Sequence, residues 1–109
     1  MQSVLNAYNE SGFMPEWASP GHRGCMIGNN SISLLTDAWM KGIRTFDKDK
    51  ALEAMVHQTQ ARSEEISSVG RDGYAEYDSL GYVPYPEVHE ATAKTLEYAY
   101  ADWCLARFA

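Results

Sequence analysis

Apolar side chains recur at steps of three and four residues in several segments of the chain, which places them on one face of an α-helix. The first such segment, residues 4–8, is followed by Gly12, so it predicts a helix that ends at this glycine. A second predicted helix is capped by Ser31 or Ser33 and ends at Gly42. Its apolar stripe, which we expect to be almost entirely buried, consists of Ile32, Leu34, Leu35, Ala38 and Trp39.

Three further helical segments follow. Asp47 can cap a third helix, and a short helix or turn spans residues 71–80 and is closed by Gly81. The last helix runs from about Val88 to the end of the chain. The apolar positions of the third and the last helix are Ala51, Leu52, Met55, Val56, Leu96, Ala99, Tyr100, Trp103 and Phe108. No run of four or more residues alternates cleanly between apolar and polar, so the sequence predicts an all-α fold.

Residues 12–30 interrupt the helical pattern with prolines, glycines and an Asn-Asn pair, which predicts a long loop. A loop of this length in a compact domain is more often functional than merely connecting. Polar residues that could carry chemistry gather in two places, in this loop and just before the last helix. They are Glu16, Trp17, His22, Arg23 and the stretch CMIGNNS (25–31) in the loop, and Glu87, His89 and Glu90 before the helix.

Length and composition indicate a single globular unit. The chain has 109 residues, of which 45% are hydrophobic and 22% charged, so it can form one modest core. A net charge of −6 argues against a surface that follows nucleic-acid phosphates. No apolar run approaches the roughly 18 to 20 residues that span a bilayer, and no signal peptide is apparent. Cys25 and Cys104 lack zinc or redox spacing, and we expect both to be small buried hydrophobes.

Each polar candidate also has a purely structural interpretation. Glu90 would favour the positive end of the last helix and could pair with Lys94 four residues on. The asparagines 29 and 30 suit a helix entry, residues 71–73 suit a turn, and His57 suits the solvated side of the third helix. Trp39 and Trp103 are expected in the core, whereas an aromatic ring such as Trp17 can stack on a sugar.

Several ordered motifs together resemble the catalytic region of glycoside hydrolase family 92. They are G-F-M-P-x-W, C-M-I-G, D-A-W-x-K-G-I, G-Y-V-P, and H-E followed by K-T-L-E-Y-A-Y-A-D-W. The resemblance covers nearly the whole chain. It implies an exo-acting α-mannosidase that removes terminal α-linked mannose, with α-1,2 linkages expected, by an inverting mechanism that depends on Ca²⁺.

The resemblance also implies an architecture larger than this chain. Family members carry an N-terminal β-sandwich followed by an (α/α)6 barrel, and residues 1–109 would be a fragment of that barrel, truncated at both ends. The opening helix lacks an N-cap and the last helix stops at Ala109 without a stop signal, as expected of a fragment. The fragment alone is expected to be inactive. A periplasmic or secreted location follows from the same resemblance.

Residue roles follow from the resemblance position by position. His89 and Glu90 match a His-Glu pair that contacts the sugar on the leaving side, and Trp17 is a further candidate for sugar binding. Many members carry a Glu a few residues before C-M-I-G, where this chain has His22-Arg23-Gly24, so Glu16 is the nearest candidate for the catalytic acid. Alternatively the acid is absent and the leaving group departs unprotonated. The catalytic base would lie beyond Ala109, and calcium ligands cannot be assigned to residues.

A different class of function is a non-catalytic helical module that binds a partner through an exposed apolar face. That interpretation predicts capped helices and self-contained burial, and the uncapped ends favour the glycosidase instead.

Overall fold

The computed structural model describes residues 1–17, 22, 25–63 and 69–109. Within this part of the chain the secondary structure is helical, with one isolated antiparallel bridge between Arg62 and Gly70 and no strand. The helices are α1 (Gln2–Ser11), α2 (Asn30–Met40), α3 (Lys48–Gln60), α4 (Tyr74–Leu80) and α5 (Ala91–Phe108). The prediction of an all-α fold is therefore confirmed.

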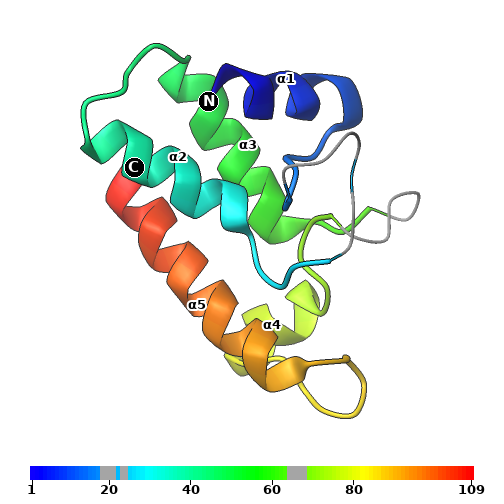
Figure 1. The fold of residues 1–109 in the computed structure, drawn as a ribbon. Helices are drawn as coiled ribbons and strands as arrows, with labels where there is room; N and C mark the ends of the chain where they lie inside the picture. The colour runs from blue at the N-terminus through cyan, green and yellow to red at the C-terminus, as the bar shows by residue number, and fades with distance from the viewer. Residues whose placement is uncertain (18–21, 23–24, 64–68) are drawn as a thin grey trace.

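The long α5 runs along one side of the molecule, next to α2, and α1 lies on the opposite side (Figure 1). α2 lies along α5 with the most extensive contact in the molecule, α3 packs on both, and α1 packs on α3. Their buried faces form the main core, which also takes in two loop residues, Met14 and Phe46. The helical members of this core are Leu5, Ile32, Leu35, Ala38, Ala51, Ala54, Met55, Ala101, Cys104 and Phe108.

A second, smaller core joins α5 to the segment around α4. Val83, Val88, Ala91 and Tyr98 form it, and Tyr77 of α4 packs against it with its ring edge toward Tyr98. The first turns of α5 are therefore held by the loop that precedes them, while the last turns are held by α2. The candidate site lies where these two packing regions meet.

The helix stops read from the sequence are confirmed at Gly12 and Gly81. Both glycines adopt the left-handed conformation and donate their N–H groups back into the helix, to Tyr8 and Tyr77 respectively. Asp47 is the N-cap of α3, where its side chain accepts a hydrogen bond from the Lys50 N–H at 3.0 Å.

Two helix starts differ from the prediction. α2 begins at Asn30 rather than after a Ser31 or Ser33 cap, because the Ser31 hydroxyl donates to the Pro15 carbonyl and thereby ties the loop to the helix. α5 begins at Ala91, so His89 lies outside it and Glu90 is its cap residue. The φ of 57° at Glu90 explains the late start, since a left-handed residue cannot belong to the helix.

Several burial predictions were wrong. Trp103, expected in the core, is 61% exposed, and Leu34 of the α2 stripe is also exposed. Cys25 is exposed whereas Cys104 is buried as expected. His57 is not simply solvated, because its ring packs on Phe13 with the ring centres 4.9 Å apart. The apolar positions of α2 and α5 surround more of each helix than one neighbour can cover, so periodicity alone overestimated the buried face.

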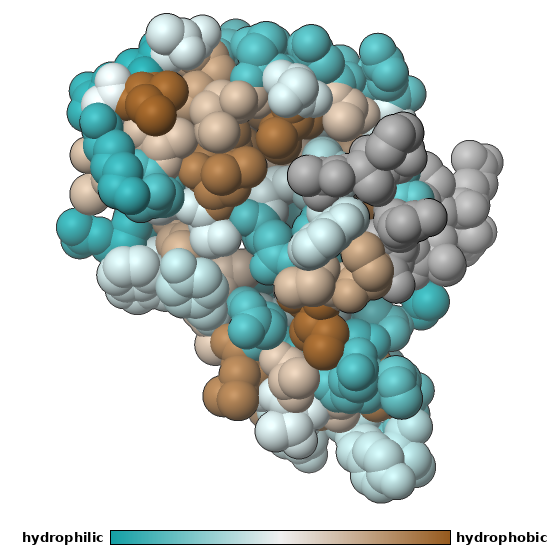
Figure 2. Space-filling view, viewed as in Figure 1, coloured by the Kyte–Doolittle hydropathy of each residue, from teal (hydrophilic) through white to brown (hydrophobic). Residues whose placement is uncertain are grey.

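Apolar side chains therefore reach the surface at several places, as Figure 2 shows for one face. On α5 the exposed set is Leu96, Tyr100 and Trp103, with the last two rings stacked 6.3 Å apart. None of the helices in the described residues is both long and apolar enough to cross a bilayer.

We predict that Asp47→Ala lowers the free energy of unfolding by about 1 kcal/mol, because it removes the side-chain cap of α3. The matched control is Asp37→Ala, which breaks an exposed ion pair with Lys41 and should cost less than about 0.5 kcal/mol. Urea unfolding followed by circular dichroism measures both. Equal losses in the two variants would show that the cap contributes nothing specific.

Candidate active site

The Glu16 carboxyl lies in the loop between α1 and α2, held between residues from two other parts of the chain. Its Oε1 atom accepts from the Gln58 Nε2 of α3 at 3.4 Å and from the Asn29 Nδ2 at 3.5 Å. The Asn30 side chain also donates to the Glu16 backbone carbonyl at 3.4 Å. These long hydrogen bonds fix the place of the carboxyl without compensating fully for its burial.

Burial raises the pKa of Glu16 from 4.5 to about 8, because a carboxylate is poorly solvated there. The amides of Gln58 and Asn29 and the positive charge of Arg71 oppose this rise in pKa, and burial outweighs them. Glu16 therefore holds its proton at neutral pH.

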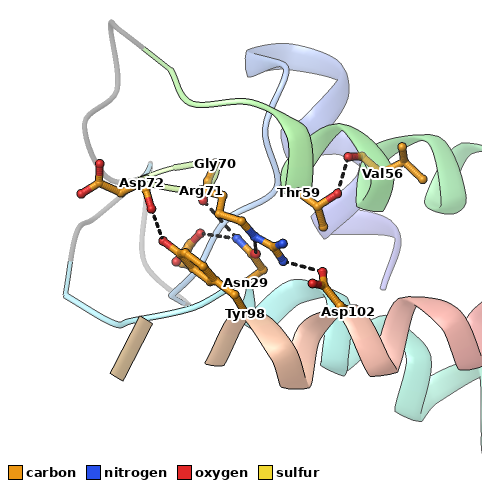
Figure 3. Close-up of polar contacts among 9 residues, drawn as sticks. Asn29, Val56, Thr59, Gly70, Arg71, Asp72, Tyr98 and Asp102 are labelled. Atoms are coloured by element: carbon orange, nitrogen blue, oxygen red, sulfur yellow. Dashed lines mark hydrogen bonds and ion pairs between the residues drawn. The ribbon is translucent and has the colours of Figure 1, made fainter. Parts of the chain in front are cut away.

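Asn29 connects Glu16 to a buried arginine. The Asn29 Oδ1 accepts from the Arg71 Nε at 3.0 Å, and its Nδ2 donates to the Gly70 carbonyl at 3.0 Å as well as to Glu16. Figure 3 shows Arg71 between Asn29 on one side and Asp102 on the other.

Arg71 is 1% exposed, so its charge needs compensation inside the protein. Asp102 of α5 provides it, with 2.9 Å between the Arg71 Nη2 and the Asp102 Oδ1. The guanidinium also lies over the rings of Tyr98 and Tyr77, 4.6 and 5.4 Å from their centres. The Tyr98 hydroxyl in turn donates to the Asp72 carbonyl at 3.0 Å (Figure 3).

Glu16 opens onto a cleft of about 590 Å³ between the loop, the segment after α3 and the start of α5. The predicted CMIG stretch forms one wall, and it lies against α5 so closely that a Cβ at Gly28 would come within 2.9 Å of the Glu97 Cβ. The charged and amide residues on the walls are Glu16, Asn30, Arg62, Asp72, Glu90, Lys94 and Glu97.

The structure brings together two of the four site residues read from the sequence. Glu16 and Glu90 both line the cleft, although they come from opposite ends of the chain. Trp17, which is 47% exposed, and His89, also exposed, are not among the described residues that line it. Lys94 pairs with Asp72 at 3.1 Å and not with Glu90 as the local interpretation expected.

Sequence reasoning missed the residues that support Glu16. Arg71 was read as part of a turn, Asn29 as a helix entry, and Gln58 was not singled out. Each does occupy its expected local position, since a turn follows Gly70 and Asn29 precedes α2. No spacing rule relates these residues, because they meet through the tertiary packing of α3, α5 and two loops.

Among the described residues, no group of three or more His, Cys, Asp or Glu side chains is placed to hold a metal ion. Calcium prefers about six to eight oxygen ligands. Asparagine side chains and backbone carbonyls can also serve as calcium ligands.

A protonated carboxylic acid at the wall of an open, polar cleft can donate a proton to a bound substrate. Glycoside cleavage needs such an acid, because a sugar alkoxide leaves poorly without a proton. The Glu16 carboxyl, with its raised pKa beside the cleft, therefore has the chemical character that acid-base catalysis on a bound substrate requires.

The chain belongs to glycosyl hydrolase family 92, whose catalytic-domain model matches residues 1–109. It is 83% identical to the family GH92 inverting mannosidase BT2199 from Bacteroides thetaiotaomicron, with a TM-score of 0.95 over 99% of this chain and 15% of that one. It is 36% identical to the GH92 α-mannosidase BT3965 of the same organism, solved in complex with mannoimidazole, with a TM-score of 0.85 over 99% of this chain and 14% of that one.

A more distant relative is an uncharacterized secreted glycosidase from Arthroderma benhamiae, 28% identical over 94% of this chain and 14% of its own length. The chain thus spans about one seventh of the relatives it matches. The agreement with the GH92 structures confirms that the five helices are part of the helical (α/α)6 barrel expected from the sequence motifs.

The raised pKa of Glu16 predicts a pH dependence of stability that Glu16→Gln removes. The folded chain keeps the proton up to about pH 8, whereas the unfolded chain loses it near 4.5, so folding becomes less favourable as the pH rises between these values. Each tenfold difference in proton affinity corresponds to about 1.4 kcal/mol.

Urea unfolding of both chains at pH 5, 7 and 8.5 measures this effect. We expect Glu16→Gln to gain stability relative to the unchanged chain as the pH rises. Parallel pH profiles for the two chains would contradict a raised pKa at this carboxyl.

Proposed function

We propose that this chain is part of an α-mannosidase that removes terminal α-linked mannose from glycans by inverting hydrolysis, with Glu16 as the general acid. The observation that carries the proposal is the buried Glu16 carboxyl, protonated at neutral pH, at the wall of the cleft. An acid with an unshifted pKa would be ionised at that pH and could not donate. The two similar structures are described as mannosidases, one of them as inverting.

In this mechanism Glu16 protonates the glycosidic oxygen as the bond to the anomeric carbon breaks. A carboxylate on the opposite face of the sugar activates a water, which attacks the anomeric carbon. Inverting enzymes separate these two carboxyls by about 6.5 to 9.5 Å to admit the water. We place the base in a part of the enzyme beyond this chain.

Glu90 and His89 are proposed to contact the sugar on the leaving side, with α-1,2 linkages preferred. Glu90 lines the same cleft as Glu16, and its left-handed backbone directs the chain away from α5 just before the helix begins. The exposed Trp17 ring, adjacent in sequence to Glu16, is proposed to stack on a sugar when substrate is bound.

The calcium dependence expected of the family is proposed here for the intact enzyme. Bound Ca²⁺ would coordinate sugar hydroxyls. We propose that other segments of the enzyme supply most of its ligands.

We further propose that residues 1–109 function with the rest of the (α/α)6 domain and an N-terminal β-sandwich, and that the segment alone is inactive. The exposed apolar residues of α5 support a role inside a larger domain. A periplasmic or secreted location is proposed because the distant relative is described as secreted.

Glu16→Gln in the intact enzyme should slow hydrolysis of mannobiose by about 10² to 10⁴-fold, since general acid catalysis contributes about that much. A dinitrophenyl mannoside should be nearly spared, because its phenolate leaves without a proton. Steady-state kinetics on both substrates measures the asymmetry. Full rates on both would exclude Glu16 as the acid, and equal losses on both would make its role positional.

His89→Ala and Glu90→Ala should each weaken hydrolysis of mannobiose and longer glycans more than that of aryl mannosides, which lack a leaving-side sugar. Glu90→Gly is the matched control, since glycine accepts the positive φ that Glu90 adopts. If Glu90→Gly restores what Glu90→Ala loses, the residue serves the backbone and not the sugar.

A further inference from the structure

The two amides that contact Glu16 have a defined orientation, which follows from the groups behind them. An asparagine or glutamine side chain can present either its oxygen or its nitrogen to a neighbour. Here the Asn29 Oδ1 faces the Arg71 Nε at 3.0 Å, and arginine has no acceptor. The Asn29 oxygen must therefore face Arg71, and its NH2 group faces the Gly70 carbonyl at 3.0 Å and the Glu16 Oε1 at 3.5 Å.

Gln58 is oriented by the same principle. Its Oε1 accepts from the Met14 N–H at 3.1 Å, so its Nε2 is the end that reaches the Met14 carbonyl and Glu16. Both amides thus present donors to one oxygen of Glu16, the Oε1. In a protonated carboxyl the oxygen that accepts two donors is the carbonyl oxygen, so the proton is carried by Oε2.

Arg71 can orient Asn29 because it is itself held from several sides. Asp102 pairs with its Nη2 at 2.9 Å, and two tyrosine rings flank the guanidinium. Arg71 also lowers the pKa of Glu16, but less than burial raises it.

From this geometry we propose that Arg71 and Asn29 are positioning residues for the general acid. Arg71, anchored by Asp102, locks the Asn29 amide so that it donates to the Glu16 Oε1, which leaves the Oε2 as the proton-bearing oxygen. The inference rests on the proposed role of Glu16. It adds the hydrogen bonds that determine which of the two carboxyl oxygens delivers the proton.

Other ionisable groups lie around Glu16. The positive charge of Arg71 lowers the pKa of Glu16, whereas burial raises the pKa of the Tyr98 hydroxyl, which therefore stays neutral. The remaining charged groups on the walls of the cleft are Arg62, Asp72, Glu90, Lys94 and Glu97.

The test uses two variants of the intact enzyme with mannobiose and a dinitrophenyl mannoside as substrates. Asn29→Asp keeps the shape and can pair with Arg71, but it replaces the NH2 group that donates to Glu16 and to the Gly70 carbonyl with a second acid. Because activity on mannobiose requires protonated Glu16, the fall of kcat/KM at high pH should move upward by about one pH unit or more. Arg71→Lys loses the Nε donor, and kcat on mannobiose should fall about 10 to 10²-fold through misplacement of the acid.

The dinitrophenyl mannoside should be much less affected by either variant, since its cleavage needs no proton. Arg107→Lys, an exposed Arg-to-Lys change on α5, is the control and should match the unchanged enzyme. If Arg71→Lys fails to fold, the pH profile of Asn29→Asp decides alone.

Different results would overturn the role of Glu16 as the acid and the role of Arg71 and Asn29 as positioning residues. If Glu16→Gln disables mannobiose cleavage while Asn29→Asp leaves its pH profile unmoved, the positioning role is wrong and Glu16 remains the acid. If Glu16→Gln has no effect on mannobiose, the proposed function of Glu16 itself is overturned. Equal loss on both substrates in Asn29→Asp would indicate a structural role only and would also overturn the inference.

Discussion

A guanidinium group almost without contact with water organises the end of the molecule where the candidate site lies. Removing such a charge from water is costly, and a partly compensated one would destabilise the fold by several kcal/mol. Arg71 is compensated by Asp102 of α5, by the side-chain oxygen of Asn29 just before α2, and by the faces of Tyr98 and Tyr77. One buried charge thus joins α2, α4 and α5 at a point where the apolar cores are small.

The position of Arg71 also bears on the protonation of Glu16. The positive charge of Arg71 favours an ionised Glu16 across the Asn29 amide. Burial raises the pKa of Glu16 more than the amides of Gln58 and Asn29 and the charge of Arg71 lower it, so the carboxyl keeps its proton.

Local chemistry made much of the fold predictable. Left-handed glycines after α1 and α4 and the Asp47 cap of α3 are decided within a few residues of chain, and all three were read correctly. Burial was harder to predict, because which apolar side of a helix is buried depends on the neighbouring helices. Trp103 and Leu34 look like core residues in the sequence and are exposed, since α2 and α5 cover each other along a single face.

The candidate site likewise has features that the local sequence predicts and features that only tertiary packing determines. Glu16 could be proposed only as the acid nearest to the position where the resembling family carries a glutamate, and its protonated state depends on burial by residues distant in sequence. The sequence does not show which end of the Asn29 and Gln58 amides faces Glu16, because that depends on the partner of the other end. Arg71 donates to the Asn29 oxygen and the Met14 N–H donates to the Gln58 oxygen, so both NH2 groups are left for Glu16. The raised pKa of Glu16 is thus a property of the tertiary packing around it, which no local pattern in the sequence contains.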